Sequence, residues 1–451
     1  MISMNLSEVA TRLGINFTAP DIHFSGCSID SRTVQKGNLF IALSGEKFDG
    51  HEFISVAINK GANAAIVEKE VSAVSAPLLL VKNSLHAMAR LAESWRSDFN
   101  IPLLAVTGSN GKTTVKEMIS SILGLKSAVL STKGNLNNEL GVPLTLFGLG
   151  KEHKYAVIEM GANHPGEIAR LTRLAKPTVA VITQCAPAHL EGFGSIDGVA
   201  RAKGEIYSGL EQNGTAVVNA DDAYAGYWST LAANNRQISF GLKNNADVRA
   251  TDILFDPQNT LTRFTVHTPS GSSTIKLPLA GVHNVMNALA AIASCSAIGL
   301  SLEDIRTGLE KMTHVHGRMQ MLITPEGSRL FDDTHNANPA SLNAGLQVLS
   351  SYTGQRWLIL GDMGELGDYA ADLHRQAGET ARKQGVDRIY AIGTYSKFAV
   401  ESFGKGARHF VELDDLLHTI KSELSPAITL MVKGSRFMAM DRVVKTLMGT
   451  N

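Results

Sequence analysis

A glycine-containing loop between an apolar run and an amphipathic stretch carries residues that could hold a nucleotide phosphate. The run from 103 to 106 predicts a buried parallel strand, and apolar residues recur at helical spacing from 115 to 123. Glycines can adopt positive φ, so backbone N–H groups of the loop can converge on phosphate oxygens. The start of the helix adds a partial positive charge. We therefore predict that a nucleotide is bound by Thr107, Gly108, Ser109, Asn110, Gly111, Lys112, Thr113 and Thr114.

Two side chains of this loop suit particular parts of a nucleotide. Lys112 can reach the terminal phosphates, and the Thr113 hydroxyl suits Mg²⁺. The loop departs from the longer phosphate-loop pattern, because Val106 occupies the place of its first glycine. The alternative is an ordinary strand-to-helix turn that contains Gly-Lys-Thr by chance. The order of strand, loop and helix favours the phosphate loop.

Acidic and imidazole side chains follow two further predicted strands. Glu159 ends the apolar stretch 155–159, and His189 lies in the loop after the stretch 178–183. The carboxyl ends of parallel strands meet at one sheet edge, where ligands bind, so both side chains should lie beside the phosphate loop. Together they could hold a divalent ion next to a phosphate. Each one alone would more often be a surface or structural residue.

Three polar residues on predicted helices are harder to interpret from spacing. Lys203 lies within the helical stretch 195–210, where a lysine is normally a solvated charge. Asn284 and Asn287 are three residues apart on the helix that opens at Gly281, and so share one face. Their amides could bond a purine edge, or one could cap the helix while the other packs.

The order of predicted elements indicates an α/β protein with three domains. Residues 1–100 predict a small mixed α/β domain, and residues 101–312 a central, mostly parallel nucleotide-binding domain. The alternating stretch 236–277 predicts antiparallel strands appended to that domain. Residues 313–451 predict a second, doubly wound and Rossmann-like domain. It lacks the G-x-G-x-x-G fingerprint, and its Lys433-Gly-Ser-Arg436 is expected to contact an anion at a helix start.

Composition excludes several classes of protein. At 451 residues the chain exceeds one ordinary core, and 42 basic residues balance 42 acidic ones. No overall field favours nucleic acid or an anionic membrane. The longest apolar run, 288–300, is too short to cross a bilayer, and the start of the chain has no secretory pattern. Cys27, Cys185 and Cys295 suggest neither disulfides nor a metal cluster, so we expect a reducing, cytoplasmic environment. We also expect a monomer.

Motifs in a fixed order resemble those of the Mur ligases, the ATP-dependent amide ligases of peptidoglycan synthesis. The resemblance runs over essentially the whole chain. Its motifs are Asp30-Ser-Arg32, Thr107-Gly-Ser-Asn-Gly-Lys-Thr113, Gly134-Asn-Leu-Asn-Asn138, Ile158-Glu159, Ala188-His-Leu190, Ala202-Lys203, His283-Asn284, Gly317-Arg318 and Asp332-Asp333. Within the family, the chain is most similar to members that join D-alanyl-D-alanine to UDP-N-acetylmuramoyl-tripeptide. Three segments indicate this similarity: Gly134-Asn-Leu-Asn-Asn-Glu-Leu-Gly-Val-Pro143, Gly161-Ala-Asn-His-Pro-Gly-Glu167 and Asp332-Asp-Thr-His-Asn-Ala-Asn-Pro339.

The resemblance implies roles for the polar residues around the nucleotide. Lys112 and its loop would hold the β- and γ-phosphates of ATP, and Thr113 and Glu159 would hold Mg²⁺. His189 and a carbamylated Lys203 would hold a second Mg²⁺, because a carbamate turns a repelling ammonium into an anion. The residues implied in nucleotide contact outside the loop are Asn284 and Asn287 at the adenine, with Arg318 and Asp333 at the phosphates and ribose.

The resemblance also implies where the second substrate binds. Asn135 and Asn138 would line the place where substrate and phosphate meet, with Asn138 counted among the catalytic residues. The first domain would hold the UDP end through Ser31, Arg32, Glu46, Lys47 and Phe48. Many relatives have a tyrosine in place of His335, so an aromatic contact to the nucleotide is altered here.

Two alternatives remain at this stage. One is another ligase of the same fold, such as an earlier Mur ligase or a folylpolyglutamate synthase. The other is a GTPase-like switch or regulatory module, which should carry an Asn/Thr-Lys-x-Asp motif that reads the base. The sequence contains no such motif.

Overall fold

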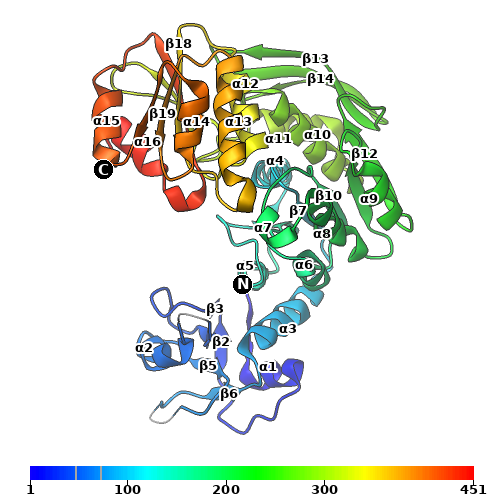
Figure 1. Cartoon of the computed structure of the whole chain (residues 1–451). Helices are drawn as coiled ribbons and strands as arrows, with labels where there is room; N and C mark the ends of the chain where they lie inside the picture. Colours follow the sequence, from blue (N-terminus) through cyan, green and yellow to red (C-terminus); the bar gives the residue numbers. More distant parts are fainter. Residues whose placement is uncertain (46–47, 72–73, 451) are drawn as a thin grey trace.

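Three units follow one another along the chain, each with a main sheet of its own (Figure 1). The computed structural model describes residues 1–45, 48–71 and 74–450. We call the units N-terminal (β1 Ser3–Asn5 to α3 Ser84–Ser97), central (β7 Leu103–Thr107 to α11 Leu302–Glu310) and C-terminal (the segment after α11, with β16 Gln320–Ile323 to α16 Asp441–Leu447). Mostly parallel sheets with helices between their strands confirm the predicted α/β class. The predicted domain boundaries at 100 and 312 stay predictions.

The N-terminal unit contains a small parallel sheet in the strand order β3-β4-β5-β6 and an antiparallel pair, β1 and β2. Its helix α3 leads to the central unit, where the Arg96 guanidinium donates to the Ala175 carbonyl at 3.0 Å. The bounds are β1 Ser3–Asn5, α1 Leu6–Leu13, β2 His23–Ser25, β3 Cys27–Ser28, β4 Leu39–Ile41, α2 Ile54–Asn59, β5 Ala64–Val67, β6 Leu78–Leu80 and α3 Ser84–Ser97.

The central unit contains one long sheet in the strand order β15-β14-β13-β12-β11-β10-β7-β9-β8. The bounds are β7 Leu103–Thr107, α4 Lys112–Gly124, β8 Ala128–Ser131, α5 Gly141–Phe147, β9 His153–Glu159, α6 Glu167–Ala175, β10 Val179–Ile182, α7 Leu190–Phe193, α8 Ile196–Ser208, β11 Thr215–Asn219, α9 Ala225–Leu231, β12 Arg236–Gly241, β13 Val248–Asp256, β14 Leu261–Thr268, β15 Gly271–Leu277, α10 Val282–Ala297 and α11 Leu302–Glu310.

The appended strands differ in part from the prediction. Strands β13, β14 and β15 are antiparallel, as predicted, but β12 pairs in parallel with β11. The prediction of antiparallel pairing from residue 236 onward was therefore wrong for β12. Alternation of polar and apolar residues reports that one face of a strand is buried, and it carries no information on the direction of the neighbouring strand.

The C-terminal unit contains a sheet in the strand order β16-β17-β21-β18-β19-β20, parallel except for the edge strand β16. Helices α12, α13 and α14 lie beside this sheet in Figure 1. The bounds are β16 Gln320–Ile323, β17 Arg329–Asp333, α12 Pro339–Leu349, β18 Gln355–Gly361, α13 Ala370–Lys383, β19 Arg388–Ile392, α14 Ser396–Phe403, β20 Ala407–Phe410, α15 Leu413–Lys421, β21 Ile428–Lys433 and α16 Asp441–Leu447.

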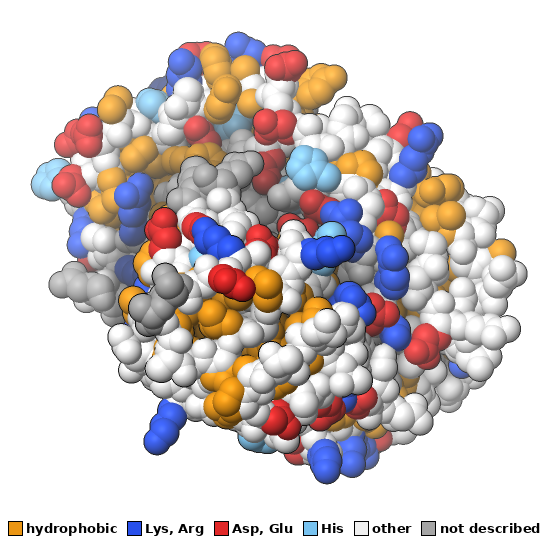
Figure 2. Space-filling view, turned by 90° about the horizontal axis from the view of Figure 1, so that it is seen from below, with side chains coloured by type: hydrophobic (Ala, Val, Ile, Leu, Met, Phe, Trp, Pro, Cys, Tyr) orange, Lys and Arg blue, Asp and Glu red, His pale blue; other side chains and the backbone are white. Residues whose placement is uncertain are grey.

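Buried apolar residues cover both faces of the central and C-terminal sheets. One face of the central sheet packs against α4, α10 and α11, and the other joins a core that continues into the N-terminal unit. Within the described ranges, no helix combines the length and apolarity that a bilayer crossing requires. Seen from the N-terminal end, the surface interleaves acidic and basic side chains (Figure 2), in keeping with the balanced charge.

Candidate active site

Strand β7 places the predicted phosphate loop at the middle of the central sheet. All five residues of β7 are buried, as the apolar run predicts. The strand pairs in parallel with β9 and β10, so that Val106 lies opposite Glu159 and Thr107 lies opposite Ile182. The carboxyl ends of β7, β9 and β10 therefore meet at the loop. Glu159 is the last residue of β9, the strand beside β7.

Two glycines of the loop adopt the left-handed backbone that the sequence predicts. Gly108 has φ +144° and Gly111, which precedes the first residue of α4, has φ +83°. The Lys112 ammonium folds back over the loop and donates to the Gly108 carbonyl at 2.7 Å and the Ser109 carbonyl at 3.4 Å. These carbonyls hold the lysine above the loop, where a terminal phosphate would meet it.

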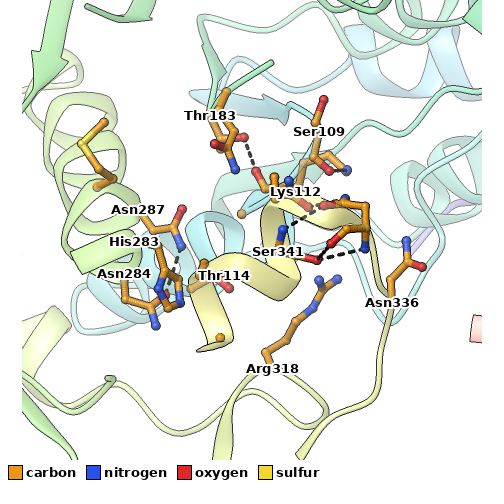
Figure 3. Close-up of a pocket in the computed structure, with 18 of the residues that line it drawn as sticks. Ser109, Lys112, Thr114, Thr183, His283, Asn284, Asn287, Arg318, Asn336 and Ser341 are labelled. Atoms are coloured by element: carbon orange, nitrogen blue, oxygen red, sulfur yellow. Dashed lines mark hydrogen bonds between the residues drawn. The ribbon is translucent and has the colours of Figure 1, made fainter. Parts of the chain in front are cut away.

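One cavity beside the loop is lined by the loop, by α4, α10 and α12, and by the ends of several strands (Figure 3). The first residues of α4 and of α12 both line it, so two helix N-termini with their partial positive charge meet there. From α10, the Asn287 amide donates to the side-chain oxygen of Asn284 at 3.0 Å, and the Asn284 amide donates to the Ala280 carbonyl at 2.8 Å. Both amide groups are thus used within the protein, and the side-chain oxygen of Asn287 lies next to Gly111 of the loop.

Replacing Gly108 by alanine is expected to damage the loop. A Cβ at this position would overlap the Thr183 hydroxyl, and the backbone already lies in a region that alanine rarely adopts. We expect the free energy of unfolding to fall by about 1–3 kcal/mol in urea titrations. Gly124→Ala, at the end of the same helix, is the matched control, because a Cβ there meets open space. Equal stability of the two variants would contradict this account of the loop.

A second cavity brings together Lys112, Glu159, His189 and Lys203. These four residues come from the loop, from the end of β9, from the residue before α7 and from the middle of α8. The C-terminal unit lines the same cavity through Arg318, His335, Asn336 and Arg436. The predicted sheet edge therefore forms a shared cleft that faces the last unit.

Lys203 is not the solvated lysine that its position on a predicted helix favours. The residue is 1% exposed, on the buried side of α8. Its Nζ lies 5.5 Å from the centre of the Phe193 ring. Burial, together with the nearby Lys112, lowers the pKa of Lys203 to about 7. The solvated reading was wrong because helical position alone does not show which face of α8 packs against the sheet.

Several cationic side chains gather in the cleft. Burial lowers the pKa of Lys112 and of Arg318, and burial together with Arg318 lowers the pKa of His335 to about 3. The main cause of each shift is loss of contact with water, and carboxylates such as Glu159 oppose it for Lys112 and Arg318. A polyanion such as a nucleoside triphosphate would be attracted by Lys112 and Arg318.

Glu159 has the free oxygen that a bound cation requires. Its Oε1 accepts from the Asn137 amide at 2.8 Å, while Oε2 is buried and has no hydrogen-bond partner among the described residues. The described side chains form no group of three or more His, Cys, Asp or Glu able to hold a metal ion alone. A single carboxylate beside a phosphate loop fits Mg²⁺, which is usually held by one or two carboxylates and by substrate phosphates.

Contacts from the C-terminal unit reach the loop directly. Arg318 donates to the Thr113 hydroxyl at 3.0 Å, and Asn338 donates to the Asn110 side chain at 2.7 Å. Asn338 also caps α12 in a capping box. Sequence reasoning named Arg318 through the resemblance, whereas Asn338 was quoted within the motif Asp332–Pro339 and was given no role.

Three predicted residues have their polar groups used elsewhere. The Thr107 hydroxyl donates to the Met160 carbonyl at 2.7 Å and is buried away from the cavity. Asn138 accepts from the Gly141 backbone at 2.9 Å, although it lines the second cavity. Asp333 lines the first cavity and forms a buried ion pair with Lys433. Lys433 is therefore not the free anion contact that its motif suggested.

Of the substrate residues predicted in the N-terminal unit, Ser31, Arg32 and Phe48 are described, and they line neither of the two cavities. Arg32 is exposed and pairs with Asp30 at 2.8 Å, and Ser31 lies in the same loop. Phe48 is 75% exposed. Glu46 and Lys47 lie outside the described residues. Asn135, by contrast, lines the second cavity near Lys203.

Comparisons with known proteins agree with this arrangement along the whole chain. Three family models match: "Mur ligase family, catalytic domain" over residues 23–96, "Mur ligase middle domain" over 106–295, and "Mur ligase, glutamate ligase domain" over 317–436. The UDP-N-acetylmuramoyl-tripeptide–D-alanyl-D-alanine ligase of Escherichia coli strain K12 is 41% identical over 450 residues, 99% of each chain.

Solved structures give the same result. A crystal structure of MurF from Acinetobacter baumannii is 36% identical and matches all of both chains with a TM-score of 0.94. The structure of MurF ligase from Thermotoga maritima in complex with ADP is 26% identical, covers 94% of this chain and 97% of that one, and has a TM-score of 0.84. On these matches, over its full length, the chain belongs to the Mur ligase family.

Proposed function

We propose that this protein is an ATP-dependent ligase that joins D-alanyl-D-alanine to UDP-N-acetylmuramoyl-tripeptide and thereby makes a peptidoglycan precursor in the cytoplasm. The observation that carries the proposal is the cationic cleft in which the phosphate loop, Glu159, His189 and Lys203 meet the C-terminal unit. The E. coli relative is named as a ligase of these two substrates, which is the basis for proposing them here. The T. maritima relative was solved in complex with ADP, which supports ATP as the nucleotide.

Each unit has a role in this proposal. Residues 1–100 hold the UDP end of the muramoyl substrate through Ser31, Arg32 and the 46–48 loop. Residues 101–312 hold ATP through the phosphate loop, with Asn287 near the adenine. Residues 313–451 bring Arg318 to the phosphates and present the dipeptide. The proposal also includes a monomer.

The first step activates the tripeptide carboxylate. A carboxylate oxygen attacks the γ-phosphorus of ATP, the new O–P bond forms as the bond to the ADP oxygen breaks, and an acyl phosphate results. Two anions must approach one another, and the positive charge of Lys112 and Arg318 lowers that barrier. Asn135 and Asn138 lie in the same cavity, where they can orient the carboxylate.

The second step forms the amide bond. The amine nitrogen of the dipeptide attacks the acyl carbon, the tetrahedral intermediate loses inorganic phosphate, and the nitrogen loses a proton. Water would hydrolyse the acyl phosphate, so the cleft must exclude it. The contacts Arg318 to Thr113 and Asn338 to Asn110 close the C-terminal unit over the loop.

The residues that would hold Mg²⁺ are Thr113 and Glu159 at one site and His189 and Lys203 at another. When bound, Mg²⁺ neutralises phosphate charge and orients the phosphates. Glu159 fits this role through its buried free oxygen. Lys203 fits only after modification, because an ammonium repels a cation.

The proposal includes a carbamate on Lys203. The ammonium first loses one proton; the nitrogen of the neutral amine then forms the new N–C bond to CO₂ and loses a second proton, so that a cation becomes an anion. Burial keeps a large neutral fraction at ordinary pH, since the pKa of Lys203 is about 7. The modified side chain would extend into the cavity that Glu159 and His189 line.

The most direct test of the proposed function is to measure which amine donor makes the protein release phosphate from ATP. Purified protein with ATP, Mg²⁺ and UDP-N-acetylmuramoyl-tripeptide is expected to release phosphate when D-alanyl-D-alanine is added, because only a fitting amine can capture the acyl phosphate. Glutamate and diaminopimelate, each with its matching acceptor, are the comparison donors. Turnover with one of them and none with D-alanyl-D-alanine would assign the protein to another ligase of this fold. Binding of GTP in preference to ATP without any substrate would favour a switch.

A further inference from the structure

A hydrogen bond between two asparagine side chains joins α12 to the phosphate loop. The Nδ2 group of Asn338 donates to Oδ1 of Asn110 at 2.7 Å. Asn338 is 7% exposed, and Asn110 is half-buried in the loop. Both side chains line the cavity beside the loop, as does Ser341 of α12 (Figure 3). The contact therefore belongs to the cavity in which the nucleotide phosphates are proposed to bind.

The cap of α12 decides which way the Asn338 amide faces. Asn338 is the residue before the helix, and its Oδ1 accepts from the Ser341 backbone N–H at 2.9 Å. An N–H in the first turn of a helix has no partner within the helix, so the amide oxygen of Asn338 must face α12. The NH₂ group on the other side of the amide then faces away from α12, toward Asn110. Turning the amide over would place a donor against a donor at the cap.

The same reasoning fixes the orientation of the Asn110 amide. Because Asn338 presents a donor, Asn110 must present its oxygen, and its own NH₂ group is turned away from Asn338. The Nδ2 atom of Asn110 is buried and has no hydrogen-bond partner among the residues that the structure describes. A buried amide donor without an acceptor costs free energy, and a phosphate oxygen would be a strong acceptor for it. Asn110 thus keeps a free donor in the loop that would bind phosphate.

We propose that Asn338 is a positioning residue whose capped amide orients the Asn110 side chain, so that the Asn110 NH₂ group donates to a phosphate oxygen of the bound nucleotide. The nucleotide is that of the proposed function, on which this role of Asn338 depends. Asn338 belongs to the C-terminal unit and Asn110 to the central unit, so the donor is oriented only while the two units are docked. Docking and nucleotide binding therefore strengthen each other by the same factor.

Asn338→Asp separates orientation from capping. An aspartate oxygen can accept from the Ser341 N–H as the amide oxygen does, so α12 keeps its cap and the urea midpoint should stay at the wild-type value. A carboxylate has no N–H to donate. It would attract the Asn110 NH₂ group and so turn the Asn110 oxygen toward the phosphates. We expect the variant to bind ADP about tenfold more weakly or worse, the usual effect of losing one hydrogen bond to a charged group.

Titration calorimetry of the full-length protein with ADP and Mg²⁺ measures this loss without turnover. Asn83→Asp is the matched control, because it makes the same substitution at the N-cap of α3, where Asn83 accepts from the His86 backbone N–H at 2.8 Å. Asn83 lines neither of the two cavities, so this variant should bind ADP like the wild type.

A double-mutant cycle isolates the orientation from the added charge. Asn110→Ala removes the donor, so Asn338→Asp in that background shows only the effect of a new carboxylate on the phosphates. The loss from Asn338→Asp should be clearly smaller there than in the wild type, because a residue that acts through Asn110 is not additive with it.

A spectroscopic signal reports the donated bond itself. In protein labelled with ¹⁵N-asparagine, the side-chain NH₂ signal of Asn110 is the one that disappears in Asn110→Ala. We expect this signal to shift when ADP binds to the wild type and to shift much less in Asn338→Asp saturated with ADP.

Wild-type ADP affinity in Asn338→Asp, losses that add fully in the double variant, or an Asn110 signal that ADP leaves unchanged would each overturn this role of Asn338. A loss of affinity accompanied by a lower urea midpoint and an unchanged Asn110 response would assign Asn338 a structural role instead and overturn it too. If the wild type itself bound neither ADP nor ATP, the proposed function would fail first. A wild type that binds nucleotide, with unaffected variants, would refute only the role of Asn338.

Discussion

Lys112→Ala should lower kcat for ADP release by about two to three orders of magnitude, the usual effect of losing one preorganised charge at a developing transition state. Lys112 is half-buried at the loop, and its pKa is lowered chiefly by the loss of solvation, so its positive charge acts in poorly solvated surroundings. ATP affinity should fall as well, because the same charge meets the phosphates before the reaction.

The fold should survive this substitution. Among the described residues, Lys112 Nζ donates only to the Gly108 and Ser109 carbonyls of its own loop, and water can satisfy these carbonyls instead. We expect the free energy of unfolding to change by less than about 1 kcal/mol. Lys126→Ala, just beyond the same helix, is the matched control, since Lys126 is half exposed and pairs with Asp304. Near-normal turnover in a folded Lys112→Ala variant would refute the phosphate-loop assignment.

Lys203→Ala should lower kcat by a similar factor, and acetate should restore part of it. The truncated side chain leaves space beside Glu159 and His189, and a small carboxylate in that space can replace the carbamate. Lys203→Met should be equally inactive but should not be rescued, because its side chain fills the space. Full activity of Lys203→Ala without any added carboxylate would exclude the carbamate role.

The amount of carbamate formed on Lys203 should depend on pH, because the amine must be neutral to react. Only the neutral amine adds CO₂, and the pKa of Lys203 is about 7, so the ammonium predominates below that pH. With ¹³C-labelled bicarbonate, the carbamate signal should weaken as the pH falls from about 8 to about 6. Arg201→Ala, exposed on the same helix, should leave the signal unchanged.

Local sequence determined the parts of this protein that depend on neighbouring residues. The apolar run at 103–106 gave a buried strand, Gly108 and Gly111 gave the left-handed loop, and spacing from 115 gave helix α4. Parallel strands direct their carboxyl ends to one edge, so Glu159 was also predictable as a neighbour of the loop. The resemblance added Lys203, for which spacing favoured the opposite interpretation.

Tertiary structure alone decided which side chains from distant segments meet. Nothing in the local pattern links Asn338 to Asn110, 228 residues away, or Glu365 to His189, or reveals that Lys433 neutralises Asp333. The period of apolar residues in the sequence shows which face of a helix or strand is buried. Side-chain contacts across the cleft depend instead on how the central and C-terminal units pack against each other. The sequence by itself therefore determined the phosphate-binding edge, and only the packing of the C-terminal unit against it decided how that edge is closed and oriented.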